Sequence, residues 1–182
     1  MNVIWLRKPE PSEPMRYRRV KSDFGELLAV WHGDHLCRLA FVDDEADVQA
    51  VLDDVTSVWE VPVEEAGDRF QPLARLQEAL AAWPREAPGL GPTLELIGTS
   101  FQQRVWQVLM RSPTGRCYTY GSIAERLGQP GAAQAVGAAV GANPIALLVP
   151  CHRVLPRSGG VGRYRWGADR KADILEAEHS GA

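Results

Sequence analysis

A run of proline and glycine residues is the feature that most limits how this chain can fold. Residues 85–92 read R-E-A-P-G-L-G-P, and neither a helix nor a strand accommodates such a run, because proline lacks an amide donor and glycine is costly to order. Charge and composition both change beyond it. The sequence therefore predicts two domains, residues 1–92 and residues 93–182.

The first part of the chain combines strand patterns with helix patterns. Residues 15–20, 26–31 and 36–42 are rich in β-branched, aromatic and apolar side chains, and a turn-forming sequence separates the last two. Residues 46–59 and 72–83 instead place their apolar side chains along one helical face. These patterns predict a sheet built on a hairpin and covered by two helices.

The hairpin turn also carries three possible metal ligands, His32, His35 and Cys37. They straddle a tight turn, and the sequence offers no evident fourth ligand for the tetrahedral site that zinc prefers. We therefore interpret the segment as a turn and expect neither a metal nor another cofactor.

The second part reads as mostly helical. Residues 93–97 fit a short strand, Ser100 followed by Gln103 is typical of a capping box that opens a helix, and residues 168–178 predict a closing helix. The predicted fold class is thus α/β (α+β). It comprises a small N-terminal sheet-and-helix domain and a mostly α-helical C-terminal domain.

Two short helices in the second part have the spacing of a helix-turn-helix. They span residues 121–127 and 131–141, with Gly128-Gln129-Pro130 between them. The later helix is built almost entirely from alanine and glycine, including Ala132 and Gly137, so another surface could approach its backbone closely. The motif predicts a winged-helix-like DNA-binding element, although any helical hairpin shares its spacing.

Charge is distributed unevenly along the chain. Residues 1–97 hold 10 Lys+Arg and 18 Asp+Glu, a net charge of −8, whereas residues 98–182 hold 10 and 5, a net charge of +5. A basic half is the electrostatic footprint of a domain that contacts nucleic acid, and a solvated arginine-rich face is the alternative.

Neither a membrane segment nor a signal peptide is evident. No apolar run approaches the ~20 residues of a membrane helix, and the first residues lack the signal-peptide pattern. Three cysteines are too few for a disulfide framework. We expect a cytoplasmic protein that does not associate with membranes.

The most reactive residue types gather in residues 147–155, L-L-V-P-C-H-R-V-L. The apolar residues fit a buried strand or extended segment, and Pro150 should end its pairing just before Cys151. A lone cysteine is usually an inert buried thiol. Here His152 and Arg153 follow at once, and a titratable and a charged neighbour favour a reactive thiol.

These segments together resemble the O6-alkylguanine-DNA alkyltransferases, single-turnover repair proteins that move an alkyl group from guanine O6 to their own cysteine. The resemblance rests on Pro150-Cys151-His152-Arg153-Val154, Asn143-Pro144, Tyr120, the loop from Ser158 to Tyr164, and Glu178. Residues 101–106 and 164–167 are most similar to the C-terminal domain of the bacterial protein Ada. The resemblance covers residues 98–180, whereas residues 1–97 share only an order of elements with the family.

The resemblance implies a catalytic set. Cys151 would be the nucleophile, because attack on an alkyl carbon needs the soft, strong nucleophile that a thiolate provides. His152 would act as the base through a water, Glu178 would orient and stabilise the imidazole, and Tyr120 would supply a proton to the leaving guanine.

The resemblance also implies how DNA is bound. The partner would be double-stranded DNA containing O6-alkylguanine, bound by a monomer, with the target base rotated out at a cost of roughly a few kcal/mol. The second helix of the motif would enter the minor groove along its small residues. Gln134 stands where the family has an arginine that fills the gap in the stack, and it lacks the planar guanidinium.

Further residues receive roles by the same resemblance. Asn143 would brace the turn before the cysteine, and Arg153 would anchor local structure. Val154 and Tyr164 would line the base pocket. Trp166 stands where some members have glycine, so it would narrow the pocket and exclude large O6 substituents.

Three other functions compete with alkyl transfer. A lesion-recognition protein would bind alkylguanine without transfer, but such family members carry another residue, typically Trp, where this chain has Cys151. An alkylation- or redox-sensing DNA-binding regulator fits the helix-turn-helix, but an Ada-like regulator needs a further zinc-bearing domain. A cysteine hydrolase is the most distant alternative, since no acyl-binding feature is evident.

Overall fold

The computed structural model describes residues 1–10, 13, 15–84 and 91–180, and it divides into two compact units, Met1–Gly98 and Thr99–Ala182. The expected boundary after residue 92 is corrected by β6 (Leu94–Ile97), which pairs within the first sheet. The units therefore divide between Gly98 and Thr99. Residues 85–90 of the proline- and glycine-rich run lie outside the described residues.

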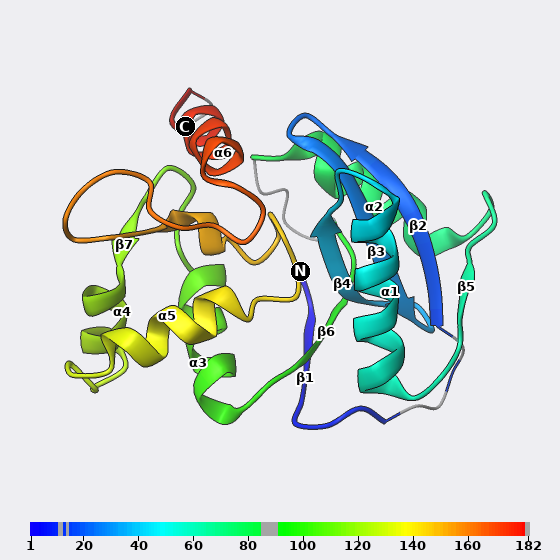
Figure 1. Ribbon diagram of the computed structural model, residues 1–182, viewed down its shortest axis with the longest axis horizontal. Coiled ribbons are helices and arrows are strands. Elements are labelled where there is room, and N and C mark those ends of the chain that lie inside the picture. The colour runs from blue at the N-terminus through cyan, green and yellow to red at the C-terminus, as the bar shows by residue number, and fades with distance from the viewer. Residues whose placement is uncertain (11–12, 14, 85–90, 181–182) are drawn as a thin grey trace. The chain divides into compact units, whose positions relative to one another are not determined.

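The first unit is built on one mixed sheet (Figure 1). Antiparallel pairing joins β2 to β3 and β3 to β4, which confirms the predicted hairpin. Parallel pairing joins β1 to β6, β4 to β6 and β2 to β5, and these pairings were not predicted. The described strands, in the order β1-β6-β4-β3-β2-β5, are Val3–Leu6, Leu94–Ile97, His35–Phe41, Gly25–His32, Met15–Ser22 and Val63–Glu65.

Two helices, α1 (Glu45–Trp59) and α2 (Gln71–Ala82), cover opposite faces of this sheet (Figure 1). Neighbouring residues of a strand point to opposite faces. On β3, Val30 shares a buried cluster with Val55 and Trp59 of α1. The next residue, Trp31, meets the ring of Phe70, the residue that precedes α2, at 5.3 Å between centroids. Both predicted helices are confirmed.

The histidines of the hairpin turn are held by a carboxylate from β6. Nδ1 of His32 lies 3.0 Å from Glu95 Oε2, and Nδ1 of His35 lies 3.5 Å from the same oxygen. The Cys37 thiol donates instead to the Val30 carbonyl at 3.3 Å. Within the part of the chain that the structure describes, no group of three or more His, Cys, Asp or Glu is placed to hold a metal ion.

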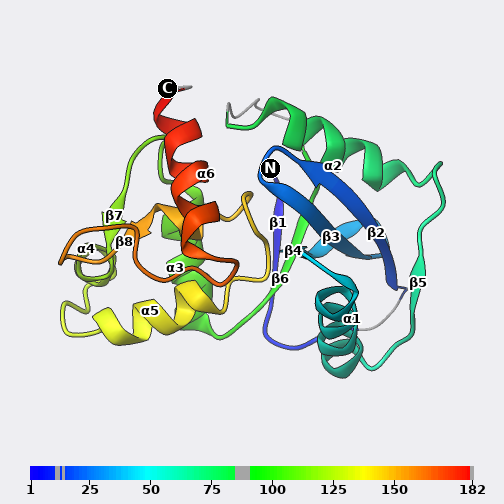
Figure 2. The same cartoon turned by 45° about the horizontal axis from the view of Figure 1, so that its top comes forward.

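The second unit is mostly helical, as predicted (Figure 2). Among its described residues, one parallel pair of short strands joins β7 to β8. In chain order the elements are α3 (Ser100–Met110), β7 (Tyr118–Thr119), α4 (Tyr120–Arg126), α5 (Ala133–Gly141), the 3-10 helix η1 (Cys151–Arg153), β8 (Val154–Leu155) and α6 (Ala168–Ser180). No described helix is both long and apolar enough to cross a membrane.

The capping box of α3 is displaced by one residue from the predicted pair. Gln102 donates its amide to Thr99 Oγ1 at 3.2 Å, and the Thr99 amide donates to Gln102 Oε1 at 2.8 Å. Ser100 is the first helical residue rather than the cap. Because a threonine and a serine are adjacent and are followed by two glutamines, the sequence pattern fits both registers.

Helices α4 and α5 form the predicted helix-turn-helix. A second capping box, between Thr119 and Ser122, begins α4, so its first helical residue is Tyr120. Gly128 turns the chain with a φ of 71°, and α5 begins at Ala133 rather than at residue 131. The indole of Trp106 in α3 donates to the Ala139 carbonyl at 2.9 Å and fixes α5 from its buried side.

Candidate active site

One asparagine fixes the segment that leads to Cys151. Asn143 is buried, and its side-chain amide donates to the carbonyls of Ile145 at 3.0 Å and Val149 at 2.8 Å. Its Oδ1 accepts from the Ile145 amide at 3.0 Å. A single side chain thus ties together both ends of the segment, which is the geometry that a bracing residue needs.

The apolar segment before Cys151 is buried, as expected, but it is not a strand. Residues 144–149 follow bends and turns around one bridge residue, and Leu147 adopts a left-handed φ of 62°. The Cys151 amide donates to the Val149 carbonyl at 2.7 Å, and Cys151 opens η1. The strand prediction is wrong here because an apolar run marks burial without fixing the backbone conformation.

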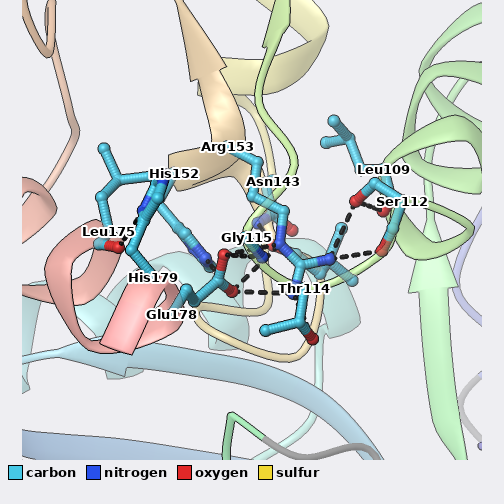
Figure 3. Close-up of polar contacts among 11 residues, drawn as sticks. Leu109, Ser112, Thr114, Gly115, Asn143, His152, Arg153, Leu175, Glu178 and His179 are labelled. Carbon is cyan, nitrogen blue, oxygen red and sulfur yellow. Dashed lines mark hydrogen bonds and ion pairs between the residues drawn. The ribbon is translucent and has the colours of Figure 1, made fainter. Parts of the chain in front are cut away.

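Three predicted catalytic residues lie on two elements, Cys151 and His152 at the start of η1 and Glu178 on α6. Cys151, His152 and Glu178 are all buried. The His152 Nε2 donates to Glu178 Oε1 at 2.9 Å (Figure 3). With the proton on Nε2, the basic nitrogen of the neutral imidazole is Nδ1.

Glu178 is shared between the histidine and an arginine (Figure 3). Arg153 donates to its carboxylate through Nε at 3.0 Å and Nη2 at 2.7 Å, and the Gly115 amide lies 3.3 Å from Oε2. The remaining Arg153 nitrogen, Nη1, donates to the Ser112 carbonyl at 2.5 Å and its hydroxyl at 2.9 Å. Arg153 therefore anchors the carboxylate to the loop that follows α3.

Burial and polar contacts shift the pKa values of the residues in this cluster in opposite directions. Burial alone would raise the pKa of Glu178, but hydrogen bonds from His152 and Arg153 outweigh it and hold that pKa at about 2. Burial lowers the pKa of His152, against the opposing effect of Glu178, so the imidazole is neutral near pH 7. Burial raises the pKa of the Cys151 thiol, and the Asn143 amide and the Lys171 charge partly oppose it.

A cavity of about 500 Å³ opens beside the thiol. Cavities of this size accommodate small-molecule ligands. Its wall combines the helix-turn-helix with the loop after β8. Among the residues that line it are Cys151, Asn143, Tyr120, Gly137, Tyr164 and Trp166. The structure thus brings six of the predicted site residues to one cavity.

The other predicted residues lie outside the cavity lining. Gln134 is exposed on α5, with Ala132 half-buried at its start. Val154 is fully buried on β8, which pairs with β7, and it is not among the residues that line this cavity. Its assignment to the base pocket stays a prediction. His152 and Glu178 are fully buried in the core of the unit and are not among the residues that line the cavity.

Lys171 is the principal residue that the sequence analysis missed. It is 1% exposed, and its Nζ donates to the Val154 carbonyl at 2.6 Å and lies 3.5 Å from the Arg163 carbonyl. Burial lowers the pKa of this lysine. Its spacing in the sequence could have indicated this burial, because Lys171 lies on the same face of α6 as Ile174, Leu175 and Glu178.

The fold and site define a two-unit protein with a buried thiol at the edge of a helix-turn-helix. Residues 100–180 match the family model described as 6-O-methylguanine DNA methyltransferase, DNA binding domain. The methylated-DNA–protein-cysteine methyltransferase of Mycobacterium leprae is 40% identical over 161 residues, which cover 88% of this chain and 90% of that protein. The regulatory protein Ada of Salmonella typhimurium is 34% identical over 179 residues. These residues make up 98% of this chain but only 49% of Ada.

Solved structures agree with these relatives. The crystal structure of the Mycobacterium tuberculosis O6-methylguanine methyltransferase is 37% identical, with a TM-score of 0.72 over 92% of this chain and 94% of that one. The crystal structure of Mycobacterium tuberculosis OGT in complex with DNA is 36% identical, with a TM-score of 0.73 over the same shares. The chain therefore belongs to the methylated-DNA–protein-cysteine methyltransferase family, which confirms the resemblance.

Proposed function

We propose that this chain repairs DNA by moving an alkyl group from guanine O6 to Cys151. The observation that carries the proposal is the buried Cys151 at a cavity that Tyr120 also lines, backed by the His152–Glu178 pair. Because nothing in this reaction removes the alkyl group from sulfur, each molecule acts once. Double-stranded DNA containing O6-alkylguanine is the partner, and one monomer suffices.

The first step forms the nucleophile. His152, with a water as relay, takes the proton of the Cys151 thiol through Nδ1, because Nε2 already donates to Glu178. Glu178 then stabilises the imidazolium as a fixed negative charge. Its pKa of about 2 means that it stays ionised and does not itself take the proton.

The second step transfers the alkyl group. The thiolate attacks the alkyl carbon, an S–C bond forms, and the C–O6 bond breaks with its electron pair passing to guanine. Tyr120 donates a proton to the departing base. Burial, followed by the charge of Cys151, raises the pKa of Tyr120, so its hydroxyl is protonated when it is needed.

The second unit carries both chemistry and DNA binding in this proposal, and the first unit is a structural domain. Helix α5 enters the minor groove along its small residues, and Gln134, which is exposed, occupies the gap left by the rotated base. We assign the protein to the cytoplasm because its three free thiols suit a reducing compartment.

Trp166 sets the size of the alkyl group that is accepted. Its ring lies edge-on to Tyr164, with centroids 5.2 Å apart, and both side chains line the cavity. We expect slower transfer from O6-benzylguanine than from O6-methylguanine, because the larger group must fit beside this ring. Equal transfer rates from the two substrates would show that Trp166 does not select against large alkyl groups.

The decisive experiment is incubation with a duplex that carries one O6-methylguanine, followed by the intact mass of the protein. We expect a gain of one methyl group in place of one hydrogen, mapped to Cys151 and absent from Cys151→Ala. Cys117→Ala is the matched control, because Cys117 is a free and half-buried thiol of the same unit. Tight binding to the lesion without any adduct would instead identify a lesion-recognition protein.

A further inference from the structure

A tyrosine hydroxyl inside the cavity has no conventional partner. Tyr164 Oη is buried, and among the residues that the structure describes none completes a hydrogen bond with it. The ring is held in place by Trp166 and lines the same cavity as Cys151. A buried donor without a partner is unfavourable, so an acceptor is expected at some stage of the reaction.

The group that this hydroxyl meets is the Cys151 thiol. Both side chains line one cavity, and after burial each affects the pKa of the other, although the present geometry completes no hydrogen bond between them. Burial and then the Cys151 charge raise the pKa of Tyr164 well above its usual range, so its hydroxyl stays a donor. A neutral thiol is a weak acceptor, whereas an anionic acceptor strengthens a hydrogen bond. The hydroxyl is therefore poorly satisfied by the thiol and well satisfied by the thiolate.

We propose that Tyr164 is a catalytic residue whose hydroxyl donates a hydrogen bond to the Cys151 thiolate and so favours the ionised nucleophile. The proton of the thiol still leaves through His152, and Tyr164 keeps its own. The role rests on the proposed function, because it requires Cys151 to be the nucleophile. When the S–C bond forms, the sulfur loses its negative charge and the hydroxyl loses its strong acceptor.

The backbone around Tyr164 is built to keep the hydroxyl in place. Lys171 Nζ lies 3.5 Å from the carbonyl of Arg163, the preceding residue, and bonds the Val154 carbonyl at 2.6 Å. The Tyr164 carbonyl accepts from the Gly167 amide at 3.3 Å. Lys171 is accordingly a positioning residue that ties the loop of Tyr164 to α6 and β8.

The test measures Cys151 ionisation without DNA. Iodoacetamide forms an S–C bond with a thiolate and releases iodide, so the alkylation rate of Cys151, followed by peptide mass mapping across a pH series, gives its apparent pKa. We expect Tyr164→Phe to raise that pKa by about one to two units and to slow alkylation below it, because a hydrogen bond to a charged group is lost. Tyr118→Phe removes a hydroxyl on β7, away from the cavity, and should leave the pKa unchanged.

A second readout separates this role from a structural one. Since the hydroxyl lacks a good acceptor while Cys151 is a thiol, Tyr164→Phe should not lower the melting temperature of the unreacted protein. An unchanged apparent pKa of Cys151 in Tyr164→Phe would overturn the proposal, even if repair of DNA slowed. Failure of methyl transfer from DNA with the pKa shift intact would instead reject the proposed function and leave the thiolate contact standing.

Discussion

Glu178 is the residue on which most polar contacts of the site converge. His152, Arg153 and the Gly115 amide all approach its carboxylate, the first two from η1 and the third from the loop after α3. Arg153 supplies the positive charge that keeps this buried carboxylate ionised. Glu178 can therefore orient and stabilise His152, but it is not a proton acceptor near neutral pH.

Removing that negative charge should impair alkyl transfer. In Glu178→Gln the amide keeps the shape of the side chain but cannot stabilise an imidazolium, so we expect the methyl-transfer rate to fall by about 10²- to 10⁴-fold. Single-turnover kinetics on a methylated duplex measure this. Glu176→Gln, at an exposed position of the same helix, is the control and should retain the wild-type rate. Equal rates for the two variants would contradict the assigned role.

The sequence could predict some of these residues far better than others. Cys151 and His152 are recognisable because a thiol, an imidazole and a guanidinium occur together after an apolar run. Glu178 lies far along the chain and was found only through resemblance. Lys171 was missed because lysine is almost never fully buried, and its place among apolar side chains on one face of α6 is a weaker signal than its charge.

At the scale of elements, helix α5 combines a surface of alanine and glycine residues with one exposed polar side chain, that of Gln134. Gly137 faces the ring of Tyr120, where an added Cβ would lie 3.7 Å from the nearest ring carbon, and Gly141 has open space around it. Both glycines line the cavity. In the proposed DNA complex, the gap in the base stack is assigned to Gln134, whose side chain is exposed on the same helix.

A charged planar group at that position should speed repair of duplex DNA. We expect Gln134→Arg to raise the second-order methyl-transfer rate by roughly tenfold, corresponding to ~1.4 kcal/mol of added stacking and charge in the rotated-base complex. Rapid-quench kinetics on a methylated duplex measure it. O6-methylguanine as the free base is the control substrate, because it leaves no gap to fill. An unchanged duplex rate would show that glutamine is sufficient.

The capping box of α3 offers a direct test of element boundaries. Thr99→Ala should lower the free energy of unfolding by about 1 kcal/mol, because the Thr99 hydroxyl satisfies the Gln102 amide at the start of the helix. Ser100→Ala should cost less, because Ser100 is already helical. Urea unfolding of both variants measures the difference. A larger loss of stability in Ser100→Ala than in Thr99→Ala would instead show that Ser100 is the cap, as first predicted from the sequence.

Two short parallel strands, β1 and β5, were not predicted from the sequence, whereas the short parallel strand β6 was. β1 and β5 are only four and three residues long, and β5 reads V-E-E, with no alternation to distinguish it from a loop. Their partners are distant in sequence, so no turn signal marks the pairing. The long strands β2 and β3, in contrast, were predictable because local turns and apolar content specify an antiparallel hairpin.

At the scale of the whole molecule, the division into two units depends on β6. This strand lies after the proline- and glycine-rich run but pairs with β1 and β4, so the chain returns to its first sheet before starting the second unit. Composition marks the run as a break, but it cannot reveal which sheet accepts the next strand. That information resides in tertiary pairing, which local patterns do not contain.

Acid should destabilise the protein through Glu178. Its pKa of about 2 is below the ordinary 4.5, so ionisation favours the folded state, and this contribution is complete above pH 4.5 and lost as the pH falls toward 2. We expect it to amount to about 3 kcal/mol. Urea unfolding at about pH 6 and about pH 3 should show less acid sensitivity in Glu178→Gln than in wild type. Identical sensitivity would exclude this carboxylate as a major source.

The clasp that Asn143 makes has an evolutionary consequence. Its amide donates to the carbonyls of Ile145 and Val149 at the same time, so both bonds depend on the length of chain between these residues. Point substitutions of the apolar residues between them can be accommodated by repacking. An insertion or a deletion cannot, because one end of the clasp would be released and the thiol displaced. We therefore expect evolution to substitute residues between Asn143 and Cys151 but not to change their number.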